Sequence, residues 1–85
     1  MGDATYKAIV QKTFALGKHG PYAKASSEEL GTITFSLNGK VWKEDRSPEE
    51  GDVVILSDVR LKHAGWRAES GRFFKPSDQQ AQQLQ

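Results

Sequence analysis

The sequence predicts an all-β fold, a small barrel of five mostly antiparallel strands. Apolar and polar residues alternate in several short stretches, turn-forming residues recur about every 8 to 12 residues, and no stretch has the pattern of a long helix. A chain of 85 residues has room for one domain. Closing its strands into a barrel removes the sheet edges that promote aggregation.

The first strand is expected over residues 6–16, where apolar side chains share one parity: Tyr6, Ala8, Val10, Phe14 and Leu16. Period two is the pattern of a half-buried strand, so Phe14 is expected to face the core. Residues 17–21 then form a turn, because two glycines and a proline interrupt a strand. A second strand follows over residues 22–25.

Residues 32–37 alternate again and predict the third strand, with Ile33 and Phe35 facing inward. Asn38-Gly39 follows it and is the preferred dipeptide of a two-residue hairpin, since both positions tolerate positive φ. Val41 and Trp42 are therefore expected to begin the returning strand.

Residues 53–56 form a continuous apolar run after a glycine, which is typical of a strand covered on both faces. Residues 66–68 and 72–74 predict a final strand or hairpin. The domain is expected to span residues 1–76, and residues 77–85, with five glutamines, to form a flexible polar tail. The predicted core contains Ala8, Val10, Ile33, Phe35, Val53 and Ile55.

Several classes of function are disfavoured by composition. Without cysteine, the chain can form neither a disulfide nor a thiolate zinc site. His19 and His63 stand beside glycines without a neighbouring nucleophile and acid, so no catalysis, metal or cofactor is expected. The start of the chain lacks a basic apolar leader, and no apolar run approaches about 18 residues, so a cytoplasmic protein without membrane contact is expected.

Charge is unevenly distributed although the net charge is only +1. Residues 1–25 carry net +3 from four lysines and one aspartate, residues 26–58 carry net −5 from three basic and eight acidic groups, and residues 59–76 carry net +4 from five basic groups and one glutamate. The blocks either form solvated faces or fold into a bipolar surface.

Two segments resemble a known family. The run from Val10 to Lys24, with Phe14 and the sequence Gly17-Lys18-His19-Gly20-Pro21-Tyr22-Ala23, is similar to the first two strands of S1 and cold-shock OB domains. The run from Pro48 to Val54, with Gly51-Asp52 before two valines, is similar to the start of their fourth strand. This resemblance covers about residues 6–75 and implies an OB-like Greek-key barrel.

The chain also departs from that family. Cold-shock domains carry two aromatics separated by a glycine on the second strand, whereas here His19 and Tyr22 are the nearest equivalents and Pro21 intervenes. Phe35 has inward parity, so the full stacking platform of these domains is missing.

Basic and aromatic residues interleave in two clusters, one around the first turn and one near the end of the chain. Single-stranded nucleic acid is held by stacking on aromatics and by cations along the backbone. The first hypothesis is therefore a non-catalytic domain that binds single-stranded RNA, or else DNA, with little sequence preference. Its candidate site residues are Lys12, Lys18, His19, Tyr22, Lys24, Arg60, Lys62, Trp66, Arg67 and Arg72.

The alternative is a small β-barrel module that docks a protein partner. In this hypothesis Trp42, Trp66 and the acidic loop over residues 44–52 form the docking patch, with Trp42 exposed. The net charge near zero favours docking, and the basic clusters favour nucleic acid.

Overall fold

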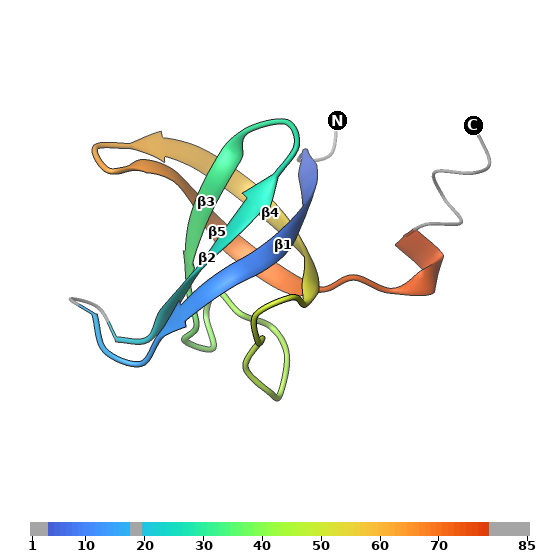
Figure 1. Cartoon of the computed structure of the whole chain (residues 1–85), viewed down its shortest axis with the longest axis horizontal. Coiled ribbons are helices and arrows are strands. Elements are labelled where there is room, and N and C mark those ends of the chain that lie inside the picture. The colour runs from blue at the N-terminus through green and yellow to red at the C-terminus, as the bar shows by residue number, and fades with distance from the viewer. Residues whose placement is uncertain (1–3, 18–19, 79–85) are drawn as a thin grey trace.

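The chain forms a closed barrel with the strand order β1-β2-β3-β5-β4 (Figure 1). This computed structural model describes residues 4–17 and 20–78. All paired strands are antiparallel except β3 and β5, which are parallel. The five-stranded, mostly antiparallel barrel is therefore confirmed. Its strands are β1 (Thr5–Phe14), β2 (Tyr22–Ser27), β3 (Gly31–Ser36), β4 (Val53–Lys62) and β5 (Gly65–Phe73).

The barrel interior is filled by the inward parity of each strand. Ala8, Val10, Ile33 and Phe35 are buried as predicted. On β4 the prediction of Val53 is wrong: Val53 is only half-buried, and its neighbour Val54 is fully buried. In a continuous apolar run no polar residue marks the outward positions, so the sequence does not show which of two neighbouring residues faces the core. The cluster comprises Ala8, Val10, Ala23, Ala25, Ile33, Phe35, Val41, Trp42, Val54, Leu56 and Ala68.

Ile55 is only 7% exposed, although it pairs with Lys7 and lies one residue out of phase with Val54. Three consecutive residues of β4, from Val54 to Leu56, are thus buried. The apolar run is covered on both faces at this point, as the sequence predicted.

The hairpin predicted at Asn38-Gly39 is wrong, because neither residue is among those with positive φ. The chain instead continues in a helical turn, in which the amides of Val41 and Trp42 donate to the carbonyl of Asn38 at 3.1 and 2.9 Å. The side-chain oxygen of Asn38 accepts from the amide of Lys40 at 2.9 Å. Asn38 therefore acts as a local cap for this turn.

Trp42 forms no returning strand and makes a single parallel bridge to Gly71. It is 3% exposed, packs against Phe35 and Phe73, and donates its indole N–H to the carbonyl of Arg46 at 2.7 Å. A Cβ added to Gly71 would lie 3.2 Å from the Trp42 ring, so glycine permits this close approach. The expectation that Trp42 is exposed is wrong, because its ring fills the core of a domain with few large side chains.

The chain after β5 ends its described part in a short helical turn over residues 76–78. Arg72 holds this turn through two hydrogen bonds to the Asp78 carboxylate, at 2.8 and 2.9 Å. The guanidinium and the amide of Lys75 lower the pKa of Asp78 to about 2, and the same pairing raises the pKa of Arg72. The rest of the predicted flexible tail, residues 79–85, lies outside the described residues.

Candidate nucleic-acid interface

A β-bulge on β1 decides which side chains face outward. Val10 pairs with Ala25 and Lys12 with Lys24, so Gln11 has no partner on β2. One extra residue shifts the side-chain parity of everything that follows it. Phe14, which shares sequence parity with Val10, therefore leaves the interior and lies opposite Tyr22 on the outer face.

Phe14 and Tyr22 form a stacked aromatic pair at the end of β1 and the start of β2. Their ring centroids are 4.6 Å apart and the ring planes differ by 12°. The ammonium groups of Lys12 and Lys24 lie 5.4 and 5.6 Å from the Phe14 centroid, within the range of a cation–π interaction. The pair is thus half-buried and flanked by cations.

Gly17 fixes the position of Tyr22 from the turn. A Cβ at this position would lie 2.7 Å from two carbons of the Tyr22 ring and 2.8 Å from the carbonyl oxygen of Gly20. Only glycine leaves room for the ring where it stands. The turn thereby helps to place the aromatic pair on the outer face.

The pairing registers align outward side chains into one row across all five strands. Lys12 pairs with Lys24, Lys24 with Thr34, Thr34 with Arg67, and Arg67 with Arg60. Directly paired residues share a face of the sheet, and four strand spacings span about 19 Å. We call this set the cationic row: Lys12, Lys24, Thr34, Arg67 and Arg60.

The cationic row needs a change of face within β4. Leu56 points into the core, and Val59, three residues later, also packs against it. Asp58, between them, has φ of 52°, which is unusual for a residue other than glycine. This local twist leaves Arg60 outward, beside Arg67.

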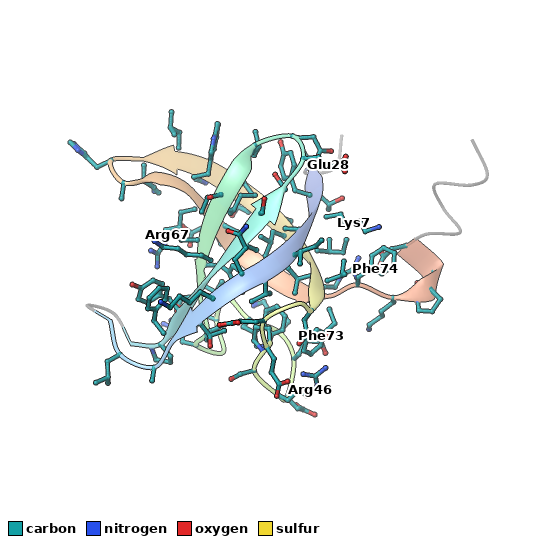
Figure 2. All side chains as sticks on the ribbon, viewed as in Figure 1. Lys7, Glu28, Arg46, Arg67, Phe73 and Phe74 are labelled. Carbon is teal, nitrogen blue, oxygen red and sulfur yellow. The ribbon has the colours of Figure 1, made fainter. Side chains whose placement is uncertain are left out.

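A hollow of about 360 Å³ lies along the cationic row. It is bounded by the β1–β2 turn and by the β4–β5 turn, and these two turns lie on the same side of the barrel (Figure 1). Figure 2 shows Arg67 on this side and Lys7 and Phe74 on the other. The hollow is lined by Gly17, Gly20, Pro21, Tyr22, Lys24, Thr34, Ser36, Ala64 and Arg67.

Most cations of the cationic row lack an acidic partner within the described ranges 4–17 and 20–78. The ion pairs there are Arg46 with Asp52, Arg60 with Asp58 and Arg72 with Asp78. Arg60 is 63% exposed and its pair is open to solvent, so the pair contributes little to stability. Lys12, Lys24 and Arg67 can therefore take an anion without first losing a salt bridge.

The sequence-predicted site residues divide into three groups. The outer face brings together Lys12, Tyr22, Lys24, Arg60 and Arg67. Lys62 is exposed at the end of the β4–β5 hairpin, which also carries Arg60 and Arg67. Trp66 and Arg72 are placed differently, since Trp66 packs against the core and Arg72 binds Asp78. Lys18 and His19 lie outside the described residues.

Sequence reasoning missed two members of this face, Phe14 and Thr34. Phe14 shares sequence parity with Val10 and was therefore predicted in the core, because no residue type in this segment indicates a bulge. Thr34 is not among the predicted site residues, since its neighbours Lys24 and Arg67 are brought to it only by strand pairing. The knowledge of which strands pair was the missing signal.

The alternative docking patch is not assembled as the sequence suggested. Trp42 is buried, and Glu44 accepts a hydrogen bond from the amide of Phe73 at 3.0 Å. Asp52 binds the amide of Glu49 at 2.8 Å and pairs with Arg46. Two carboxylates of this loop, Glu44 and Asp52, are therefore engaged within the protein, whereas Asp45, Glu49 and Glu50 are exposed.

Comparison of the chain with protein-family models, with curated proteins and with solved structures finds no match. Over residues 4–17 and 20–78, no cluster of three or more histidine, aspartate or glutamate side chains is arranged to hold a metal ion. No helix in this part of the chain is long and apolar enough to cross a membrane. The geometry of the outer face is thus the basis for assigning a function.

Proposed function

We propose that this protein is a non-catalytic domain that binds single-stranded nucleic acid, RNA in preference, across the outer face of the barrel. The observation that carries the proposal is the cationic row running beside the stacked Phe14–Tyr22 pair. Cations along a groove hold the phosphate backbone, and aromatic rings beside them stack the bases.

The position of the hollow supports kinship with OB domains. OB-fold proteins bind oligonucleotides on the face of strands 2 and 3, between the β1–β2 and β4–β5 loops. The hollow in this chain lies over β2 and β3 and is bounded by the corresponding two turns. We therefore propose a relationship to S1 and cold-shock OB domains, with Phe14 and Tyr22 in place of their full platform.

The proposal is tested by titrating oligo-uridine RNA into labelled protein at about 50 mM and about 200 mM salt. Binding is expected at the lower salt and weaker binding at the higher, because phosphate contacts release counterions. Tyr22→Ala is expected to weaken binding by about 1 to 3 kcal/mol, the value of one stacked base.

Phe74→Ala is the matched control for Tyr22→Ala. Phe74 is also half-buried beneath a lysine, with the Lys7 ammonium 4.6 Å from its ring centroid, but it lies on the other side of the barrel (Figure 2). This variant should bind RNA as the parent does. Absence of binding at the lower salt with protein at about 100 μM, the weak end of non-specific affinity, contradicts the proposal and favours the docking alternative.

A further inference from the structure

Thr34 occupies the centre of the cationic row and is its one neutral member. Its pairing partners are Lys24 on β2 and Arg67 on β5. Its side chain is half-buried and lines the hollow. A single-stranded nucleic acid that crosses the cationic row must therefore pass over a hydroxyl group between two cations.

A hydrogen bond to the neighbouring strand decides whether the Thr34 hydroxyl donates or accepts. Oγ1 of Thr34 donates its proton to the carbonyl of Trp66 at 3.3 Å. A hydroxyl has one proton and two acceptor lone pairs, so the committed Thr34 hydroxyl offers only lone pairs to a ligand. Phosphate oxygens, which are also acceptors, gain nothing from it. While the Thr34 hydroxyl keeps its bond to Trp66, a group that binds it must be a donor.

The positions of Tyr22 and of the cationic row decide which donor group of a bound nucleic acid reaches Thr34. Tyr22 and Lys24 are two residues apart on one face of β2, about 7 Å along the strand. A base stacked at Tyr22 would leave its backbone over the cationic row, where Lys24 and Arg67 can hold consecutive phosphates. The sugar between these two phosphates would then lie over Thr34.

We infer that Thr34 accepts a hydrogen bond from a ribose 2′-hydroxyl and thereby makes the site prefer RNA to DNA. The 2′-hydroxyl is both donor and acceptor, and deoxyribose lacks it. This inference rests on the proposed function and adds a specificity-determining residue to it.

The test compares oligo-uridine with oligo-deoxyuridine of equal length, which differ only at the 2′ position. The parent protein is expected to bind the RNA about three- to tenfold more tightly, the range of one net hydrogen bond. Thr34→Val should abolish this preference while leaving the affinity for the DNA unchanged. Thr32→Val is the control, because Thr32 is an exposed threonine on the same strand and face, paired with Ser26 outside the hollow.

A second measurement needs no variant. RNA with 2′-fluoro substitution keeps a ribose-like sugar but cannot donate, so the parent protein should bind it as weakly as the DNA. Equal affinity for RNA and 2′-fluoro RNA overturns the inference, as does an unchanged RNA preference in Thr34→Val or an equal loss for RNA and DNA.

Oligo-cytidine provides the remaining arm. If Thr34 accepts from a base amine, cytidine is preferred to uridine in RNA and DNA alike, which overturns the assignment to the 2′-hydroxyl. If neither RNA nor DNA binds the parent protein, the proposed function itself fails, and this outcome is distinct from equal binding of both.

Discussion

The salt dependence of binding gives a quantitative test of the cationic row. The row holds four cations, and each phosphate contact on a single strand contributes about −0.7 to the slope of log affinity against log salt. Four contacts therefore predict a slope of about −2.8, or about a 50-fold loss of affinity between 50 and 200 mM salt. Removing one contact should reduce the slope to about −2.1 and the loss to about 20-fold.

The perturbations are Lys24→Gln and Arg67→Gln, measured by fluorescence anisotropy with a labelled oligo-uridine over a series of salt concentrations. Each variant should make the slope less negative by about 0.7, and the double variant should make it less negative by about 1.4. Lys7→Gln is the control, because Lys7 lies on the far side of the barrel over Phe74 (Figure 2). A parent slope near zero, or a reduction in Lys7→Gln equal to that in Lys24→Gln, would refute the reasoning.

Three further predictions concern the scaffold. Ile33→Ala should lower the free energy of unfolding by about 2 to 5 kcal/mol in urea denaturation, because the side chain is fully buried, and a loss below about 1 kcal/mol would contradict its place in the core. Gly17→Ala should weaken RNA binding, since the new Cβ would lie 2.7 Å from the Tyr22 ring and 2.8 Å from the Gly20 carbonyl oxygen, so both the ring and the turn must shift. Unchanged affinity would contradict this. Asp78 should titrate near pH 2 by NMR, so its ion pair stabilises the fold above the usual pKa of 3.8 and is lost as the pH falls through about 2. Arg72→Gln should return the midpoint toward 3.8, and a parent midpoint already there would contradict the pairing.

Period-two patterning was sufficient to predict the barrel and much of its core. Ile33 and Phe35 alternate with threonines, and both are fully buried. The pattern failed where a single residue changes the parity. The unpaired Gln11 turns Phe14 outward, and no local sequence signal marks such a bulge.

Local turn chemistry also proved weaker than the demands of the barrel. Asn38-Gly39 favours a hairpin in isolation, but β3 pairs with β2 and β5 and leaves no place for a returning strand. The chain therefore turns helically and places Trp42 over Gly71. Burial of this large ring outweighs the preference of one dipeptide.

The candidate site was predicted as a set of residue types but not as an arrangement. Lys12, Lys24, Arg60 and Arg67 were predicted because basic and aromatic residues interleave around them, but their alignment depends on four strand registers that the sequence does not state. Arg72 was named on the same grounds, yet Asp78, six residues later, holds it.

The most direct test of the proposed interface is an NMR titration of the labelled protein with a short oligo-uridine RNA. Backbone amide shifts should change at Tyr22, Lys24, Thr34 and Arg67, which line the hollow. The amides of Glu44 and Arg46, in the connection between β3 and β4, should not move. Shifts confined to Glu44 and Arg46, or no shift at any of these residues with excess RNA at low salt, would contradict binding across the cationic row.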